Sequence, residues 1–378
     1  MRITAAKILN FRNLVETELS FSPQVNLFLG GNGQGKTNLL EALNYVALGR
    51  SHRGTSSEDL IRFDSDHLHV SLSVTSDDGE VTLFEYGVQR GGGRRMRIDG
   101  RSIARRAELV GRLATVFFSP DSISLVQGGP ERRRRFADQG VASVDRYYLE
   151  QLRSCQRVLR QKARLLQEMK KGRILARDGR REVEIWNREL AHHTVPVYRG
   201  RAAYAQRIEP HATRTYAELA GEKVPLEFAY KPGLETAPVG EENEHLEKDI
   251  LSVFDYIMEE EIRRGRPISG PQMDDFVVRL AGRELRAFGS QGEARTAAIS
   301  LILAQSDVVF QMRYTHPVLF FDDIFSELDR CRSRRLQELS IQRHQIFVAT
   351  ARAQDVVGWQ PDGIRVWEVK QGRLEAVA

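Results

Sequence analysis

Short segments with the two-residue alternation or apolar runs of β-strands open the chain. They cover residues 3–9, 15–19 and 25–29 and are separated by polar breaks. A glycine-rich turn at 30–35 follows. After this turn the apolar residues recur at helical spacing, at Leu39, Leu40, Leu43, Val46 and Ala47. The pattern predicts a strand, a loop and a helix in that order.

The strand pattern returns across residues 67–118. Asp78-Gly79 and Asp99-Gly100 within it are turn signals of the kind that join hairpin strands. Residues 265–378 again mix sheet and helix character. We therefore expect an α/β fold whose sheets are built from both ends of the chain.

A helical region separates these two parts. One heptad seam, broken by Lys162, runs through Leu152, Cys155, Leu159, Leu166 and Met169. A second seam, in which Pro196 predicts a kink, runs through Trp186, Leu190, His193 and Val197. The polar stretch between the seams contains Gly172, so we predict a helical hairpin with a loop at its tip.

The boundaries of this helical region follow from composition. Residues 231–244 are rich in Pro, Gly and Glu and predict a loop, and a further helix is expected at 245–264. The predicted division is an N-terminal part of the head at 1–125, an inserted helical lobe at 126–264, and a C-terminal part of the head at 265–378.

Residues 30–37 match G-x-x-x-x-G-K-[ST], the pattern of a phosphate-binding P-loop. Glycines let successive N–H groups turn toward phosphate oxygens, and the following helix adds a favourable dipole. Lys36 is expected to reach the β- and γ-phosphates, and Thr37 to ligate Mg²⁺. The predicted nucleotide-binding residues of the loop are Gly30, Asn32, Gly33, Gly35, Lys36 and Thr37. A plain glycine-rich turn is the alternative.

A second segment supports the first. Residues 317–323 form an apolar strand that ends in Asp322 and Asp323. A carboxylate at the carboxyl end of a strand beside a P-loop is suited to hold Mg²⁺, and this is the role expected of Asp322. Asp323 is expected to orient or deprotonate the attacking water. Together with Lys36, the two acids form the predicted catalytic set. The alternative is a strand followed by an acidic turn.

The net charge of the chain is +5, but the charge is unevenly distributed. Residues 131–210 contain 20 Lys and Arg against 10 Asp and Glu, a net charge of +10, so the rest of the chain sums to −5. This excess favours contact with the phosphates of DNA. Because aromatic residues are not interleaved in a stacking pattern, we expect duplex DNA and not single strands. The candidate contacts are Arg132, Arg133, Arg134, Lys170, Lys171, Arg173 and Arg177. The alternative is that they are solvated helix charges or pack against the head.

Two cysteines, Cys155 and Cys331, belong to no metal-ligand pattern and favour a reducing, cytoplasmic location. The residues after Met1 lack the apolar segment of a secretory leader. Apolar runs are too short for a membrane helix.

Two further segments carry a resemblance to ABC-type ATPases. Residues 290–293 read Ser-Gln-Gly-Glu before a long helical run, which fits an ordinary capping box. They also resemble the superfamily's signature motif, and residues 326–329 resemble its D-loop. In that superfamily the signature binds the γ-phosphate of a nucleotide held by the opposite subunit. The resemblance therefore implies a composite site to which Ser290, Gln291, Gly292 and Asp329 contribute.

The combination of motifs resembles the RecF family of bacterial recombination mediators. The segments that carry this likeness are 9–13, 31–38, 128–130 with the arginines that follow, 288–292, 322–323 and 326–329. The resemblance implies an α/β, ABC-type (SMC/RecF-like) P-loop ATPase head with an inserted, mainly helical lobe. It also adds Arg12 and Asn38 to the nucleotide-binding residues.

The resemblance further implies ATP and Mg²⁺ as cofactors, an ATP-dependent homodimer, and weak ATP hydrolysis stimulated by DNA. It implies binding of double-stranded DNA at gap junctions and a role with RecO and RecR in bringing RecA to single-strand gaps. DNA repair, replication and the SOS response to DNA damage are the processes concerned. The alternatives are a transporter-type ABC ATPase subunit, an SMC-like structural head that tethers DNA, and a P-loop kinase.

The chain departs from the family pattern at several positions. Glu293 stands where the family often has Gln, and Gln272-Met273 where it usually has His-Arg. Thr350 lies near the position of the switch histidine of most ABC ATPases, and Asp323 replaces a glutamate. Arg53 resembles an arginine that SMC-type heads place near the nucleotide, or is a solvated loop residue.

Overall fold

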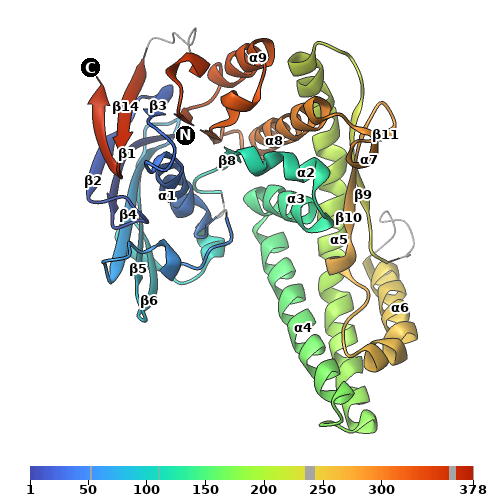
Figure 1. Cartoon of the computed structure of the whole chain (residues 1–378). Coiled ribbons are helices and arrows are strands. Elements are labelled where there is room, and N and C mark those ends of the chain that lie inside the picture. The colour runs from blue at the N-terminus through green and yellow to red at the C-terminus, as the bar shows by residue number, and fades with distance from the viewer. Residues whose placement is uncertain (52, 110, 235–242, 357–362, 378) are drawn as a thin grey trace. The chain divides into compact units, whose positions relative to one another are not determined.

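The computed structural model of the chain describes residues 1–51, 53–109, 111–234, 243–356 and 363–377. The chain divides into two compact units (Figure 1). The first unit comprises Met1–Ile123, Arg214–Lys223 and Arg295–Ala378, and the second comprises Ser124–Thr213 and Val224–Ala294. Two helices, α5 (Ala176–Ala220) and α8 (Gln291–Arg313), cross the boundaries.

The first unit holds two six-stranded sheets and their helices. Its strands are β1 (Arg2–Leu9), β2 (Thr17–Ser20), β3 (Val25–Leu29), β4 (His67–Thr75), β5 (Val81–Gln89), β6 (Gly93–Ile98), β7 (Arg101–Ile103), β8 (Thr115–Phe118), β12 (Val318–Asp322), β13 (Ile346–Thr350), β14 (Ile364–Lys370) and β15 (Arg373–Val377). Its helices include α1 (Lys36–Leu48) and α9 (Arg330–Ile341), and its 3₁₀ turns are η1 (Glu58–Leu60), η2 (Arg106–Leu109), η3 (Pro120–Ile123), η5 (Ile324–Glu327) and η6 (Ala353–Val356).

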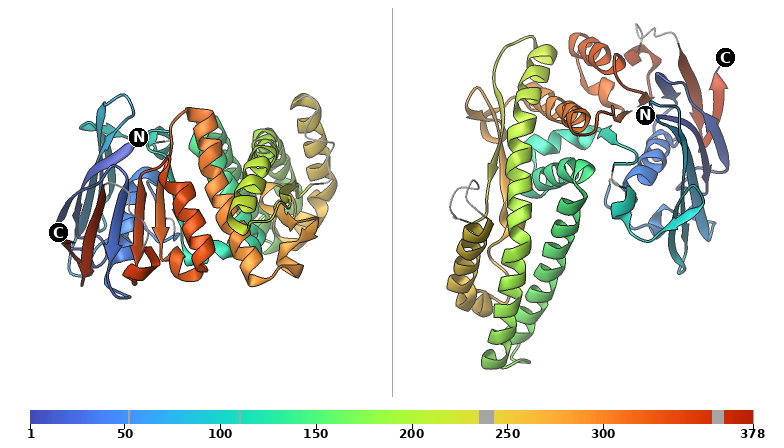
Figure 2. Two further views of the ribbon diagram at one scale, coloured as in Figure 1. Left: turned by 90° about the horizontal axis from the view of Figure 1, so that it is seen from above. Right: turned by 180° about the vertical axis from the view of Figure 1, so that it is seen from behind.

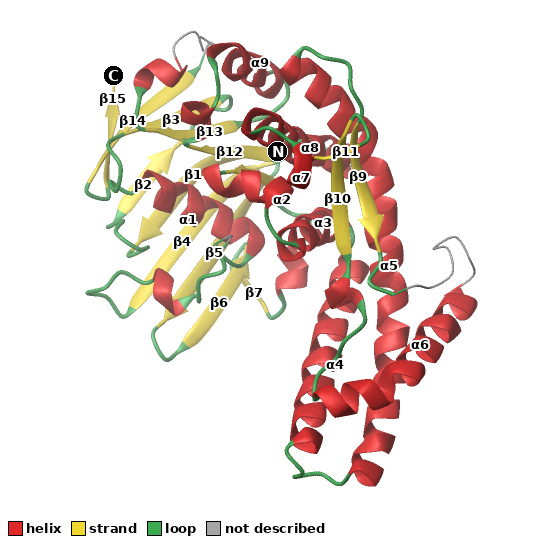
Figure 3. Ribbon diagram, turned by 45° about the vertical axis from the view of Figure 1, so that its right-hand side comes forward, coloured by secondary structure: helices red, strands yellow, loops and turns green. Residues whose placement is uncertain are grey.

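One sheet has the order β15-β14-β3-β13-β12-β8, and all its pairs except β14–β15 are parallel. Every residue of β12 and β13 is buried, as expected for the middle of a parallel sheet covered on both faces. Because β3, β13 and β12 are parallel neighbours, their carboxyl ends meet at one edge (Figure 3).

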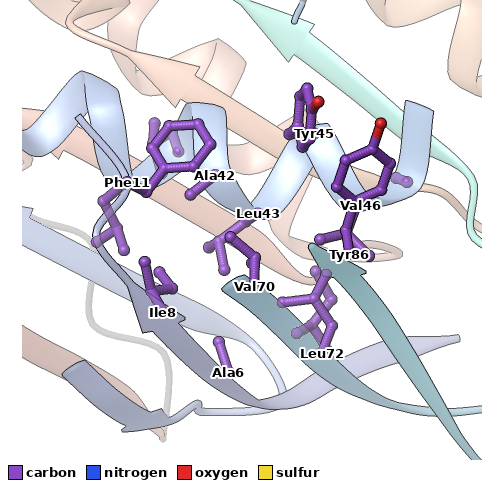
Figure 4. Packing of buried hydrophobic residues seen from close by; sticks show 14 of the residues in the cluster. Ala6, Ile8, Phe11, Ala42, Leu43, Tyr45, Val46, Val70, Leu72 and Tyr86 are labelled. Carbon is purple, nitrogen blue, oxygen red and sulfur yellow. The ribbon is translucent and has the colours of Figure 1, made fainter. Parts of the chain in front are cut away.

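The other sheet is antiparallel, with the order β2-β1-β4-β5-β6-β7. In β4 and β5, buried residues alternate with residues that are mostly half-buried, and the buried face packs against α1 (Figure 4). The Tyr45 ring of α1 lies edge-on to Tyr86 of β5, with centroids 4.5 Å apart, and edge-on to Phe11 at 6.0 Å. These strands confirm the alternation read from the sequence, although β2 begins later than the predicted strand at 15–19.

The second unit is mainly helical. Its elements are α2 (Ser124–Gln127), α3 (Pro130–Val144), α4 (Arg146–Lys170), the larger part of α5, β9 (Leu226–Lys231), α6 (Asn243–Arg264), η4 (Pro271–Met273), β10 (Asp275–Leu280), β11 (Arg283–Glu284) and α7 (Leu285–Phe288). Helices α4 and α5 form the predicted hairpin and lie side by side in both views of Figure 2. The 45-residue helix α5 continues through Pro196 and Pro210. The predicted loop at 231–244 lies largely outside the described residues.

The heptad seam of α4 is broken by a buried ion pair. Lys162 Nζ lies 2.6 Å from Glu261 of α6, and both side chains are completely buried. The Lys162 ammonium also lies 5.1 Å from the centroid of the Phe254 ring. Lys162 therefore joins α4 to α6 and is not a solvated interruption of the seam.

A second buried polar group ties α3, α5 and the segment before β10 together. Arg201 is 3% exposed and donates to both carboxylate oxygens of Asp138, at 2.9 and 3.0 Å, and to Asp274 at 2.6 Å. Tyr230 donates to Asp274 at 2.6 Å. The Asp274 carboxylate is thus enclosed by hydrogen-bond donors, as a buried charge requires.

The units differ from the predicted division at two places. Residues 265–294 group with the helical unit because β10 pairs with β9 along its whole length. The end of α5 groups with the first unit, where Arg214 pairs with Asp307 at 2.6 Å and Arg335 donates to the Leu219 carbonyl at 3.0 Å. Both differences come from contacts between residues far apart in sequence. Within the described ranges, no helix is long and apolar enough to cross a membrane.

Candidate functional site

Three neighbouring strands of the parallel sheet deliver candidate residues to one edge. The P-loop follows β3, Asp322 ends β12, and Thr350 ends β13, which lies between them. The pairing of Asp322 with Ala349, and of Ala349 with Phe28, sets the three strand ends level. The parallel topology therefore brings together residues separated by most of the chain.

Lys36 is the first residue of α1 and folds back over the loop that precedes it. Its Nζ donates hydrogen bonds to the carbonyl oxygens of Gly30 at 2.6 Å and Gly31 at 2.9 Å. Burial lowers the pKa of Lys36, while the charges of Asp323 and Asp322 act in the opposite direction. The ammonium is thus placed inside the curve of the loop, where a phosphate would be held.

Thr37 and Asp322, the two predicted Mg²⁺ ligands, lie in direct contact. The Thr37 hydroxyl donates to Asp322 Oδ1 at 2.8 Å. Burial raises the pKa of Asp322 to about 6, although the Thr37 hydrogen bond and the Arg53 charge both lower it. A buried carboxylate beside a hydroxyl offers two oxygen ligands to a hard divalent cation, and the cation would in turn stabilise the buried negative charge.

Protein side chains alone do not complete such a cation site. Among the described residues there is no group of three or more His, Cys, Asp or Glu that could hold a metal ion. Mg²⁺ usually takes one or two protein ligands and completes its six with phosphate oxygens and water. Thr37 and Asp322 fit this requirement only together with a bound phosphate.

Asp323 has an unusual backbone conformation for a residue other than glycine. Its φ is 53°, in the left-handed region, and its N–H donates to the Ala349 carbonyl at 2.8 Å. Thr350 is completely buried, and its hydroxyl accepts from the Arg352 N–H at 3.2 Å. The hydrogen bond between Asp323 and Ala349 ties the turn after β12 to the end of β13.

Glycine is required at different positions of the loop for different structural reasons. A Cβ at Gly30 would lie 2.3 Å from the Val369 carbonyl oxygen of β14, so β14 leaves no room for a side chain. Gly33 and Gly35 have φ values of 77° and 115°, which favour glycine. Asn32 is exposed on the loop.

The segment around Arg12 borders the P-loop. Asn13 donates to the Gln34 carbonyl at 3.1 Å and accepts from Asn38 at 2.8 Å. Arg12 forms a two-pronged ion pair with Glu41 of α1, at 2.7 and 3.2 Å. Arg12 and Asn38, added through the family resemblance, therefore lie on the flank of the loop.

The predicted signature lies at the beginning of α8. The Ser290 N–H donates to Glu293 at 2.8 Å, and the Glu293 N–H donates to the Ser290 hydroxyl at 3.2 Å. This reciprocal pair is the capping box read from the sequence, and it lowers the pKa of Glu293. Ser290 and Gln291 are exposed. Asp329 is likewise exposed and caps α9 by accepting from the Arg332 N–H at 2.9 Å.

Residues 2–373 match the family model described as the RecF/RecN/SMC N-terminal domain. The chain is 30% identical over 374 residues to the DNA replication and repair protein RecF of Staphylococcus aureus, covering 99% of this chain and 100% of the relative. The chain belongs to the RecF family.

Solved structures agree with this assignment. A RecF recombination mediator of the RecFOR pathway, in a form named RecF-ATPrS, superimposes with a TM-score of 0.91 at 27% identity. That match covers 100% of this chain and 98% of the other. An SMC head from Pyrococcus furiosus, 18% identical and covering 99% and 95%, shares the fold with a TM-score of 0.56. The fold is thus the α/β ATPase head fold of RecF and SMC proteins.

Two of the arginines predicted to contact DNA in this RecF-family chain form hydrogen bonds and ion pairs within the protein. Arg133 is 3% exposed and forms a two-pronged ion pair with Asp275 at 2.8 and 3.1 Å. Its remaining nitrogen donates to the Gly128 carbonyl at 2.7 Å. Arg134 is partly buried and donates to the Asp274 carbonyl at 2.6 Å. The prediction that Arg133 binds DNA is wrong because its guanidinium is buried and occupied, and Arg134 is similarly engaged.

The other candidates are exposed. Arg132 lies on the surface of α3, and Lys170, Lys171, Arg173 and Arg177 surround the tip of the hairpin. Several of them have acidic neighbours: Lys171 and Arg173 lie 3.5 and 2.9 Å from Glu168, and Arg177 lies 3.4 Å from Asp178. Because these pairs are solvated, they leave the side chains accessible to another anion.

A second basic surface escaped the sequence analysis, which counted charge only over 131–210. Residues 90–105 contain six arginines and one acid. Arg94, Arg95, Arg97 and Arg101, the edge-strand arginines, are exposed on β6 and β7. In the described part of the chain, none of these four forms an ion pair with a carboxylate. A charge count over shorter windows would have found them.

Proposed function

We propose that this RecF-family chain is an ATP-dependent DNA-binding protein of recombinational repair and replication. Two copies close on ATP and hold double-stranded DNA, and weak hydrolysis releases it. The carrying observation is the contact between Thr37 and Asp322, which joins the P-loop to the acidic end of β12. The match to a RecF named with ATPrS supports ATP as the nucleotide.

The proposal assigns a role in ATP binding or hydrolysis to the candidate residues at the carboxyl edge of the parallel sheet. Lys36 binds the β- and γ-phosphates, and Thr37 and Asp322 hold Mg²⁺, which neutralises charge on the phosphates. Asp323 orients the attacking water. The nucleotide-binding residues Gly30, Asn32, Gly33, Gly35 and Asn38 surround the phosphates, together with Arg12.

The second copy completes the site. Ser290, Gln291 and Gly292 present an exposed helix N-terminus, which favours a phosphate of the opposite protomer's nucleotide. Asp329 would lie at the same interface. Because Ser290, Gln291 and Asp329 are exposed in a single chain, they are available to a partner copy.

Sedimentation tests the dimer. We expect a dimer with ATP and a monomer with ADP. Ser290→Arg should remain monomeric with ATP, because its side chain fills the place of the phosphate. Ser290→Thr is the matched control, since threonine keeps both the hydroxyl and the helix cap, and it should dimerise. A wild-type protein that stays monomeric at saturating ATP would contradict the composite site.

Duplex DNA is the proposed partner of the basic surfaces. Two multiple variants separate these surfaces: the edge-strand arginines changed to Gln, and Lys170, Lys171, Arg173 and Arg177 changed to Gln. Each arginine or lysine that contacts a phosphate should reduce the slope of log Kd against log salt by about 0.9. Arg146→Gln/Arg188→Gln, on exposed faces of α4 and α5, is the control. If neither variant changes the slope, DNA binds elsewhere.

The biological setting is proposed from the relatives. A matched RecF structure is named as part of the RecFOR pathway. We infer that RecR and RecO are partners of this chain, that gap junctions are its DNA targets, and that its cytoplasmic role is to assist loading of RecA. A gapped duplex should stimulate ATP turnover more than single-stranded DNA does. Turnover that no DNA stimulates would instead favour an SMC-like tethering head.

A further inference from the structure

Glu41 is a buried carboxylate in the second turn of α1, directly behind the P-loop. It is completely buried, yet no predicted role involves it. Besides the two hydrogen bonds from Arg12, it accepts one from the Ser51 hydroxyl at 2.5 Å. The Arg53 guanidinium lies 3.8 Å from the same carboxylate. One buried carboxylate therefore contacts two arginines beside the candidate phosphate site.

The two arginines are held to different degrees. Arg12 is 22% exposed and has short hydrogen bonds to Glu41, and its backbone is fixed by an N–H bond to the Leu60 carbonyl at 2.7 Å. Arg12 also has a φ of 52°, an unfavourable conformation that its surroundings maintain. Arg53 is 41% exposed, and its contact with Glu41 is too long for a hydrogen bond. Arg12 is thus fixed, whereas Arg53 can turn away.

Both arginines lie close to groups of the nucleotide site. Arg12 precedes Asn13, which contacts Gln34 and Asn38 of the P-loop. The Arg53 guanidinium shares the Glu41 carboxylate with Arg12, which places both arginines on the same flank of the loop. The carboxylate that pairs with both arginines therefore lies beside residues of the candidate nucleotide site.

We propose that Glu41 is a positioning residue of the nucleotide site, which orients Arg12 toward the bound phosphates and leaves Arg53 free to exchange Glu41 for a phosphate. This inference rests on the proposed binding of ATP. The fixed guanidinium acts as a preorganised phosphate ligand, whose ordering cost is met during folding and not on binding. The neutral side chain of glutamine would fill the same space but hold Arg12 through a single weaker hydrogen bond.

The test is a double-mutant cycle on the affinity for ATPγS. Arg12→Ala and Glu41→Gln should each weaken binding by about tenfold, and the double variant should bind no more weakly than Arg12→Ala. Glu18→Gln is the matched control, because Glu18 is exposed and paired with Lys7 on the same unit. It carries the same charge change and should leave the affinity unchanged.

Folding is measured in parallel. If Glu41→Gln does not fold, Ser51→Ala replaces it in the cycle, because this change removes one hydrogen bond to Glu41 and no charge. We expect a two- to threefold loss of affinity from Ser51→Ala that disappears in the Arg12→Ala background.

Other outcomes would overturn the inference. Effects of Arg12→Ala and Glu41→Gln that multiply would show that Glu41 acts independently of Arg12. If Glu41→Gln lowers the Tm but leaves the affinity for ATPγS unchanged, Glu41 has a purely structural role. If Glu41→Gln binds ATPγS more tightly, the Glu41 carboxylate only reduces the positive charge at the nucleotide site. If the wild-type chain does not bind ATPγS, the proposed function itself fails. If the wild-type chain binds ATPγS but the free-energy effects of Arg12→Ala and Glu41→Gln are additive, the proposed function stands and only the role of Glu41 is disproved.

Discussion

The Thr37 hydroxyl donates a 2.8 Å hydrogen bond to the Asp322 carboxylate, across a sequence separation of 285 residues. Both atoms are Mg²⁺ ligand types, and the bond between them holds their oxygens at one point of the sheet edge. A shared ion would replace this bond with two metal contacts. The relationship therefore predicts how the two residues behave together.

Thr37→Val and Asp322→Asn should each lower ATP turnover by on the order of a hundredfold, because each removes one proposed ligand of the Mg²⁺ ion that we expect to neutralise the phosphates. The double variant should be little less active than the less active single variant, since the proposal assigns both residues to the same ion. Steady-state turnover with excess Mg²⁺ is the measurement. EDTA should abolish wild-type turnover, and full additivity of the two changes would argue against a common ion.

Gly30→Ala should damage the P-loop, although the change adds one methyl group. The new Cβ would lie 2.3 Å from the Val369 carbonyl oxygen, and a backbone atom of a central sheet cannot move away cheaply. We expect a lower Tm and at least about a tenfold loss of ATP affinity. Gly31→Ala is the control, because the nearest atom would be 3.8 Å away. Equal behaviour of the two variants would disprove the steric explanation.

Local patterns in the sequence were sufficient for the elements and for the P-loop. Alternation along β4 and β5 and the heptads of α4 depend on near neighbours, and Lys36 and Thr37 lie within one short motif. Asp322 could be assigned because parallel strands end at a common edge. The patterns and the P-loop are carried by single strands, helices or loops, whereas Asp322 follows from a general rule of parallel sheets.

Pairings between distant segments could not be read in this way. Arg133 looked like its exposed neighbour Arg132, and only the position of Asp275 shows that it is buried in an ion pair. The membership of residues 265–294 in the helical unit depends on pairing of β10 with β9. Glu41 stands within an apolar helix, a weak signal whose meaning becomes clear only from distant partners such as Arg12 and Ser51.

The Lys162–Glu261 pair leads to a prediction about the stability of the helical unit. Lys162→Met should destabilise the protein by about 3–5 kcal/mol, because Glu261 is left buried without its counter-ion. Lys162→Met/Glu261→Gln should recover most of this loss. Glutamine keeps the acceptor for the Ile268 N–H, which now donates to Glu261 at 3.0 Å.

Urea unfolding of the three proteins measures these differences. Lys171→Met is the control, since Lys171 is exposed and its pair with Glu168 is solvated, and a change of less than about 0.5 kcal/mol is expected. A double variant as unstable as Lys162→Met would show that the pair is needed for more than mutual neutralisation.

His344 predicts how the stability of the first unit depends on pH. The side chain is 7% exposed, and its Nδ1 lies 2.9 Å from the Pro317 carbonyl oxygen. Burial lowers the pKa of His344 to about 4, and neighbouring His316 also has a lowered pKa because of burial. Among the charged neighbours, Arg343 lowers the pKa of His344 and Asp307 raises it.

The unfolded chain, with a histidine pKa near 6.5, takes up the proton before the folded chain as the pH falls. The stabilising effect of the neutral, buried ring is therefore fully present above about pH 6.5 and is lost progressively toward pH 4. His344→Gln keeps a donor for the Pro317 carbonyl but does not titrate. Between pH 7.5 and 5, the wild type should lose about 2 kcal/mol more unfolding free energy than this variant. His316→Gln separates the contribution of the second ring, and identical pH profiles of wild type and His344→Gln would show that His344 is protonated equally in both states.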